Sequence, residues 1–266
     1  ESVGAYAFSE CIALTDVVFK DSTIDKKTIG NYAFYNCRAL SNINFGNAVT
    51  SIGDYAFVMT ESLTSIEFPD SLVRIGNYAF SPYSNGYGGS YIEYTTSNLE
   101  NIKFGSGIKT IGKQAFYKNE KLKSIDLTGS NLTLIDTGAF QNCISLIEIN
   151  LSGNNLVIES SAFYDDKYLK NVTFGAGIKS IGSNAFYNCL SISELNFFDG
   201  LDRIYSDAFR NCKSISLVTL PNTLSSIGNS AFYNCERITS VHIPDKVTEI
   251  QGGCFTNCHL LKKVTI

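Results

Sequence analysis

The sequence is poor in the residues that most catalytic and metal sites use. It has only two histidines, His242 and His259, and neither is matched by a serine or cysteine nucleophile that stands apart from the general sequence pattern. The carboxylates are scattered, and no pair of them stands out. Cys254 and Cys258 lie four residues apart with only His259 nearby, which is a poor set of zinc ligands. We therefore expect no enzyme activity, no metal site and no cofactor.

Charge of one sign and long apolar runs are also lacking. The 266 residues carry a formal net charge of −4, far too small an imbalance for a dedicated nucleic-acid-binding protein. No apolar run approaches the roughly 18–20 residues of a transmembrane helix, and no basic-then-apolar leader opens the chain. Both ends fall inside the repeats described below, so we expect a fragment of a longer protein. The 44% of hydrophobic residues is enough for a sizeable core.

What the sequence does contain is one phrase repeated along its whole length. The clearest part of that phrase is Ala-Phe, and its eleven phenylalanines recur every 23 residues, apart from intervals of 26, 36 and 24. They are Phe8, Phe34, Phe57, Phe80, Phe116, Phe140, Phe163, Phe186, Phe209, Phe232 and Phe255. A fixed period in the twenties is typical of a solenoid, in which each coil buries its apolar residues against neighbouring coils. We therefore predict that the rings line up inside one continuous interior.

The spacing within the phrase predicts secondary structure. Residues nine and eleven after each Phe are apolar and alternate with polar neighbours, as in TSIEF at 64–68, which is typical of a short strand. Residues three and six after the Phe suit a single helical or 3₁₀ turn. Polar residues that can cap such a turn precede it: Asn31, Asp54, Asn77, Ser183 and Asn229. The prediction is an α/β solenoid of about 11 repeats, with one parallel strand per repeat and short helical turns opposite.

The phrase SIGDYAFVMTESLTSIEFPDSLVRIGNYAF at 51–80 resembles the BspA-like leucine-rich repeats, whose form is roughly LxxIxLPxxLxxIGxxAFxxC. The resemblance covers essentially all of residues 1–266, as a single solenoid with its parallel sheet on the concave face. It implies a secreted or cell-surface module without catalytic residues, associated with adhesion to host matrix proteins such as fibronectin and fibrinogen. The alternative is a structural or scaffolding solenoid that serves as an intracellular spacer.

Seven of the eight cysteines stand three residues after a Phe. They are Cys11, Cys37, Cys143, Cys189, Cys212, Cys235 and Cys258. An even number of cysteines in a secreted protein favours disulfides, but stacked residues lie about one strand spacing apart, and a disulfide needs Cβ atoms at about 3.5–4.5 Å. We therefore predict a buried ladder of free thiols. Free cysteines are more common in reducing compartments, which mildly favours the scaffold alternative.

The best candidate for a contact site is an insertion in the fourth repeat. The interval of 36 exceeds the usual 23 by 13 residues, and the extra length falls in segment 81–98, which reads as a hairpin. The segment contains Tyr83, Tyr87, Tyr91 and Tyr94 among Ser, Gly and Asn, a composition close to that of an antibody paratope. The alternative to a contact site is a surface loop without a binding function, whose tyrosines cover the adjoining coils.

A second group of tyrosines lies two residues before the Phe in the first four repeats. Its members are Tyr6, Tyr32, Tyr55 and Tyr78, and repetition predicts a ladder of stacked rings beside the insertion. Such a ladder is either a stabilising stack or a recognition strip. The outward residues of the predicted strands are small and polar, without the Trp, Tyr or Arg typical of binding hot spots. Open strand edges at the two ends favour self-association.

Overall fold

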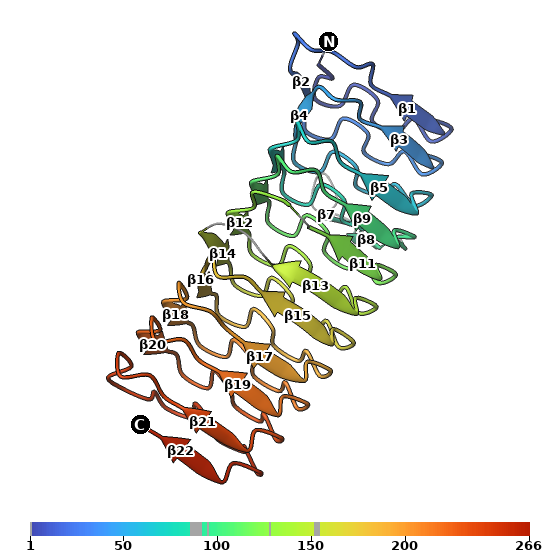
Figure 1. Ribbon diagram of the computed structural model, residues 1–266. Helices are drawn as coiled ribbons and strands as arrows, with labels where there is room; N and C mark the ends of the chain where they lie inside the picture. Colours follow the sequence, from blue (N-terminus) through green and yellow to red (C-terminus); the bar gives the residue numbers. More distant parts are fainter. Residues whose placement is uncertain (1, 86–91, 95, 128, 152–154) are drawn as a thin grey trace.

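The chain forms a parallel β-solenoid of about ten turns, drawn out into a rod with the two termini at opposite ends (Figure 1). This computed structural model describes residues 2–85, 92–94, 96–127, 129–151 and 155–266. Within those ranges there is no helix, so the helical part of the α/β prediction is wrong. The solenoid itself was predicted correctly.

Each turn contributes two short strands instead of the single strand predicted. The first column is one nine-stranded parallel sheet in the order β2-β4-β6-β10-β12-β14-β16-β18-β20. Its strands are β2 (Lys27–Ile29), β4 (Val49–Ile52), β6 (Arg74–Ile75), β10 (Thr110–Ile111), β12 (Leu134–Ile135), β14 (Leu156–Ile158), β16 (Ile178–Ile181), β18 (Arg203–Ile204) and β20 (Ser226–Ile227). The isoleucines at the strand ends pair in register, as Ile52 does with Ile75, and their side chains are fully buried.

The second column is the predicted one and is divided into shorter parallel sheets. These are β1-β3, β5-β9-β11-β13-β15, β17-β19 and β21-β22. The strands are β1 (Asp16–Val18), β3 (Asn42–Asn44), β5 (Ser65–Glu67), β9 (Asn101–Lys103), β11 (Ser124–Asp126), β13 (Glu148–Leu151), β15 (Asn171–Phe174), β17 (Glu194–Asn196), β19 (Leu217–Thr219), β21 (Ser240–His242) and β22 (Lys263–Thr265). In strands such as β5 and β17 the middle residue is buried in the core and its two neighbours are exposed, which explains the alternation read from the sequence.

The core between the two columns is built on a stack of phenylalanine rings. From Phe8 to Phe255 the rings of the Ala-Phe phrase lie face to face, with centroids 4.9–5.5 Å apart and interplanar angles of 3–10°. From Ala33 to Ala231 the alanine before each ring is fully buried, because the coils approach too closely there for a larger side chain. The predicted continuous interior is confirmed.

The segment around each Phe is a pair of tight turns and not a helical turn. Around Phe34, both Tyr32 and Asn36 are left-handed, with φ of 55° and 58°. The N–H of Ala33 bonds within its own turn (3.3 Å), while the N–H of Phe34 bonds to the carbonyl of Ala56 in the next coil (2.8 Å). Since alternate N–H groups point along the rod, they are not free for the bonds inside the segment that a helix requires.

The polar residues predicted to cap helical turns join neighbouring coils instead. The Asn31 Oδ1 accepts the N–H of Asp54 (2.9 Å), the Asp54 Oδ1 accepts that of Asn77 (2.8 Å), and the Asn77 Oδ1 accepts that of Lys113 (2.9 Å). The turns that follow Ser183 and Asn229 are likewise not helical. The side chains of Asn31, Asp54 and Asn77 therefore stabilise the stacking of coils.

Close approach of coils also explains a glycine column four residues before the Phe. A Cβ on Gly30 would lie 2.5 Å from the backbone nitrogen of Ala5 in the preceding coil. The equivalent Gly4, in the first coil, has nothing within 4 Å of such a Cβ. At Gly30 the restriction on a side chain thus comes from the neighbouring coil.

Candidate functional site

The inserted segment 81–98 carries an antiparallel hairpin. Strands β7 (Tyr83–Asn85) and β8 (Ile92–Tyr94) pair so that Tyr83 lies opposite Tyr94. The strands of the predicted hairpin are therefore present. Tyr87 and Tyr91, which the sequence places at its tip, lie outside the residues that the structure describes.

The hairpin is added to the solenoid without interrupting it. The Phe80 and Phe116 rings on either side of the insertion stack at 5.3 Å and 4°, as elsewhere in the core. Strands β5 and β9 pair across the insertion with Ile66 opposite Ile102. The coils on both sides therefore keep the usual geometry, and the hairpin extends from a continuous framework.

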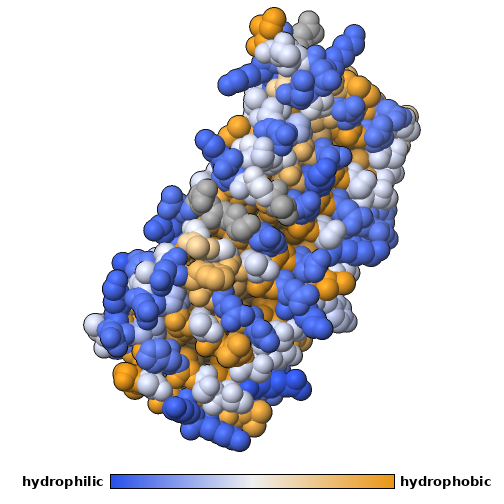
Figure 2. All heavy atoms as spheres, in the orientation of Figure 1, coloured by the Kyte–Doolittle hydropathy of each residue, from blue (hydrophilic) through white to orange (hydrophobic). Residues whose placement is uncertain are grey.

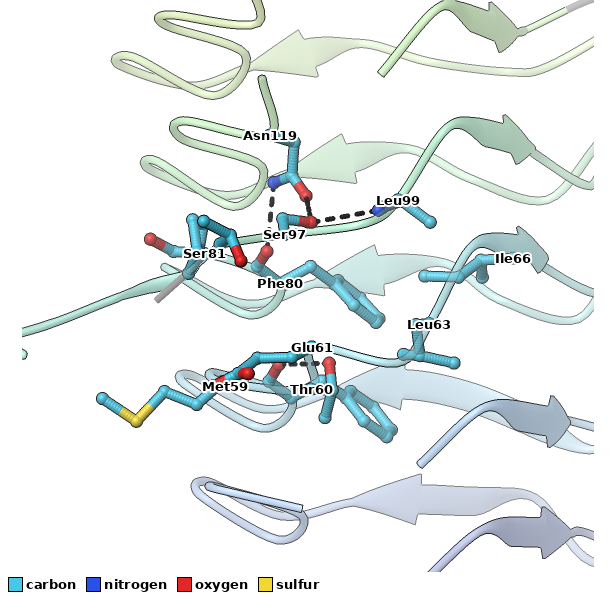
Figure 3. A pocket seen from close by; sticks show the side chains of 13 residues that line it. Met59, Thr60, Glu61, Leu63, Ile66, Phe80, Ser81, Ser97, Leu99 and Asn119 are labelled. Atoms are coloured by element: carbon cyan, nitrogen blue, oxygen red, sulfur yellow. Dashed lines mark hydrogen bonds between the residues drawn. The ribbon is translucent and has the colours of Figure 1, made fainter. Parts of the chain in front are cut away.

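A fully buried amide, Asn119, anchors the base of the hairpin (Figure 3). Its Nδ2 donates to the carbonyl of Phe80 (3.1 Å), and its Oδ1 accepts the Ser97 hydroxyl (2.5 Å). The Ser97 Oγ in turn accepts the N–H of Leu99, where the chain rejoins the solenoid (3.2 Å). Asn119 occupies the position that is cysteine in most coils, and a thiol does not have the second polar atom needed to hold Ser97.

A second amide fixes the returning strand. The Nδ2 of Asn98 donates to the carbonyl of Glu61 (2.8 Å), and its Oδ1 accepts the Lys121 ammonium (2.6 Å). The hollow beneath the hairpin, between Met59, Ser97 and their neighbours, has room for about one water molecule. The base of the insertion is thus a packed support and not a pocket for a small ligand.

The four tyrosines before the insertion form the predicted ladder. Centroid distances are 4.9 Å for Tyr6–Tyr32, 4.8 Å for Tyr32–Tyr55 and 4.9 Å for Tyr55–Tyr78, with interplanar angles of 4–6°. Burial, with the neighbouring tyrosine hydroxyls, raises the pKa of Tyr55 to about 12, so it is neutral at physiological pH. Because each interior ring is covered on both faces, the ladder offers ring edges and not flat faces to a partner.

These tyrosines have a left-handed backbone, which is unfavourable for a bulky side chain. Their φ values are 55–58°, in a region where Gly and Asn are the favoured residues. Farther along the same column stand Gly138, Asn184 and Asp207, which suit this conformation better. Stacking with neighbouring rings helps to offset the strain at the four tyrosines.

Sequence reasoning missed a second ladder in the C-terminal half. The rings of Tyr164 and Tyr187 stack at 4.8 Å, and the Arg210 guanidinium lies 4.2 Å from the centroid of the Tyr233 ring. Beside them runs a ladder of amides in which each Nδ2 bonds to the previous coil at 2.8–2.9 Å, through Asp165, Asn188, Asn211 and Asn234. The sequence feature that could have predicted this ladder is the pair Tyr-Asn, which recurs directly after the Phe. Since these amide groups bond to one another from coil to coil, we interpret the ladder as a structural feature.

The cysteines form the predicted ladder of free thiols. Cys37, Cys143, Cys189, Cys212, Cys235 and Cys258 each donate through Sγ to the carbonyl of the Phe in the preceding coil, at 3.0–3.3 Å. Burial raises the pKa of Cys258 and Cys37 to about 11 and of Cys254 to about 12. These thiols are therefore protonated and poor nucleophiles; Cys11, at the end of the ladder, is exposed.

The outward face of the second strand column is polar, and its side chains bond to one another along the rod. Examples are Asn42 to Asp16 (3.2 Å) and the Lys103–Glu67 ion pair (2.6 Å). Hydrogen bonds from the side chains of Thr15 and Asn42 lower the pKa of Asp16 below its usual value. Figure 2 shows hydrophilic residues along the length of the visible face, with hydrophobic residues between them. This face has no aromatic anchor on a described strand.

Neither a metal centre nor a membrane helix is found in the part of the chain that the structure covers. No three His, Cys, Asp or Glu side chains of the described residues gather in a way that could hold a metal ion. His242 is exposed at the end of β21. Among the same residues, no helix has the length and apolar character needed to cross a bilayer.

The repeat pattern and the solenoid together identify the family. The sequence model of the BspA type leucine rich repeat region, six copies long, matches residues 1–87, 89–216 and 179–266. The chain belongs to the BspA-type leucine-rich repeat family. This family assignment explains the Ala-Phe phrase, the glycine column and the thiol ladder as features of one repeat.

Solved structures of bacterial leucine-rich repeat proteins resemble this BspA-type chain. One from Bacteroides ovatus is 25% identical, covers 99% of this chain and 75% of its own, and superimposes with a TM-score of 0.58. Another from Eubacterium ventriosum is 23% identical, covers 96% and 80%, and has a TM-score of 0.52. No curated protein matches the chain in sequence. The structural neighbours therefore support the fold.

Proposed function

We propose that this BspA-type chain is a non-catalytic module that binds protein partners, at a cell surface or after secretion, with residues 1–266 acting as one solenoid. Leucine-rich repeat proteins generally bind proteins, and the repeat family is generally non-catalytic. The described residues contain no cluster that could hold a metal ion, and burial raises the pKa of thiols such as Cys37 and Cys258 to about 11, so they are protonated. The polar side chains of the surface repeat from coil to coil and bond to one another. Such a surface suits binding over an extended face better than it suits catalysis.

The contact surface in this proposal is the inserted hairpin together with the tyrosine ladder Tyr6, Tyr32, Tyr55 and Tyr78. The observation that carries it is the hairpin's attachment: a segment unlike the repeats extends from an uninterrupted ring stack and is anchored by a buried amide. Binding residues are often found on loops held by a rigid scaffold. The ladder ends at Tyr78, two residues before Phe80, beyond which the insertion begins. The two groups of tyrosines would then form one surface.

The sheet face has a secondary role in this proposal. We expect it to be the concave face, and its mutually bonded polar residues favour weak, distributed contacts. The scaffold alternative loses its support from the cysteines. Seven of the eight are buried, so their reduced state reflects the packing of the ladder and says nothing about the compartment.

The test is binding of the chain to immobilised fibronectin and fibrinogen, the partners that the family resemblance suggests. Replacing Tyr83, Tyr87, Tyr91 and Tyr94 with Ser should weaken binding by at least about tenfold and leave the melting temperature unchanged. The matched control replaces Tyr168 and Tyr205, which are 66% and 43% exposed on other coils, with Ser. Absence of binding by the wild type would reject these matrix proteins as partners. Equal binding by wild type and hairpin variant would reject the site.

A further inference from the structure

The thiol ladder contains one carboxyl group, Asp166. It occupies the cysteine position between Cys143 in the preceding coil and Cys189 in the next, and it is fully buried. Aspartate is almost never fully buried unless it is paired. The surroundings of this side chain therefore define its protonation state.

The other residues of the ladder show what this position does. The Cys143 Sγ donates to the carbonyl of Phe116 (3.3 Å), and the Cys189 Sγ donates to that of Phe163 (3.1 Å). The Nδ2 of Asn119, another polar replacement, donates to the carbonyl of Phe80 (3.1 Å), whereas the Thr60 hydroxyl at the same position donates to the carbonyl of Phe57 in its own coil (2.8 Å). Six thiols and Asn119 thus share one role at this position, which is to donate a hydrogen bond to the Phe carbonyl of the preceding coil. By the same register, the acceptor that faces residue 166 is the backbone carbonyl of Phe140.

The two oxygens of Asp166 have different environments. The Oδ1 accepts the backbone N–H of Cys143 (2.8 Å). The Oδ2 is buried and has no hydrogen-bond partner. An ionised carboxylate has no proton to donate to the Phe140 carbonyl and would leave a charged oxygen buried without a partner, which is strongly unfavourable. A protonated Oδ2 removes both problems.

The neighbouring groups supply no compensating positive charge. Cys143 and Cys189, which pack against Asp166 from the two adjacent coils, are themselves protonated because burial raises their pKa. The nearby charged groups are Asp165, next along the chain, and Glu120, which acts on Cys143, and both are negative. Burial raises the pKa of Asp166 well above its usual value, and the charge on Asp165 raises it further, against the lowering effect of the Cys143 N–H.

We propose that Asp166 is a neutral carboxylic acid in the folded chain, that its Oδ2–H donates to the Phe140 carbonyl in place of the usual thiol, and that this turn is a pH-sensitive link in the solenoid. In the unfolded chain Asp166 ionises with a pKa near 3.8. Above that pH folding takes up a proton, so each further unit lowers the folding equilibrium constant about tenfold until the raised folded-state pKa is reached. The contribution of this link is therefore complete in acid and is lost as the pH rises.

The test compares the pH dependence of unfolding in wild type, Asp166→Asn and the control Asp245→Asn, from pH 4 to pH 8. Asparagine keeps the donor without the titration, as Asn119 does in its own coil. The unfolding equilibrium constant of the wild type relative to Asp166→Asn should rise about tenfold per pH unit above pH 4, whereas Asp245→Asn, at an exposed position, should follow the wild type. A ratio that stays constant from pH 4 to pH 8 would overturn the proposal.

Two further measurements keep the test independent of whether Asp166→Asn folds well. Asp166→Cys restores the usual ladder residue, and it should show the same loss of pH dependence. In the folded wild type, infrared difference spectra against Asp166→Cys near neutral pH should contain the carbonyl stretch of one neutral carboxyl group. Absence of that band, with a carboxylate band in its place, would show that Asp166 is ionised and would refute the assignment.

Discussion

Replacing Asn119 tests whether the hairpin is held by its buried amide. Asn119→Ala removes the donor to the Phe80 carbonyl and the acceptor of the Ser97 hydroxyl. A buried polar group left without a partner costs about 1–3 kcal/mol, so the two losses together should cost about 2–6 kcal/mol. Asn119→Cys restores a weaker donor to Phe80 and loses only the Ser97 contact, for about 1–3 kcal/mol. The expected order of stability is wild type, then Asn119→Cys, then Asn119→Ala.

The assay combines thermal unfolding with limited proteolysis by a protease that cleaves after tyrosine. At about 2–4 °C per kcal/mol for a chain of this size, a loss of about 3 kcal/mol lowers the midpoint by roughly 6–12 °C. Cleavage within 81–98 should rise most in Asn119→Ala. The control Cys143→Ala removes one ladder donor in the next coil, away from the hairpin. If Asn119→Ala and Cys143→Ala expose segment 81–98 equally at matched stability, the amide does not anchor the hairpin.

Other substitutions test the packing of coils. Gly30→Ala should cost about 1–3 kcal/mol in thermal unfolding, because its Cβ meets the backbone of the preceding coil, while Gly4→Ala should be close to neutral; equal effects would contradict the close-approach argument. Phe163→Ala should cost about 3–5 kcal/mol in denaturant unfolding, and a loss below about 1 kcal/mol would mean that the ring stack is not the core. Tyr55→Asn relieves left-handed strain but loses two stacked neighbours worth about 0.5–1.5 kcal/mol each. We expect a net loss of about 1 kcal/mol by thermal unfolding, and a more stable variant would show that strain outweighs stacking.

The parts of the fold set by the period of the sequence could be predicted. Identical spacing places equivalent residues one above another, so the phenylalanine stack, the tyrosine ladder and the free thiols follow from counting alone. The strand around Ile66 was visible because polar and apolar residues alternate there. The hairpin followed from an interval longer than the period.

The parts that depend on contacts between coils could not be predicted. The first strand column was missed because strands such as β6, Arg74–Ile75, are too short to show alternation. The turn around Phe34 has the spacing of a helical turn, and only the alternate bonds to the next coil distinguish it. Asp166 reads in the sequence as an ordinary acidic residue beside Asp165. Its protonation depends on complete burial and on an unpartnered oxygen, and neither is encoded in local spacing.

The undisturbed ring stack on both sides of the insertion has a consequence for engineering. Because the Phe80 and Phe116 rings keep the spacing and angle of the other coils, the framework does not depend on the sequence that the insertion carries. Ser97 and Asn119 are joined by a hydrogen bond beneath it, so we expect that a foreign loop of different length joined above them would leave the rest of the rod intact. The fourth repeat is thus a natural grafting point, at which a recognition peptide can be exchanged without redesigning its carrier.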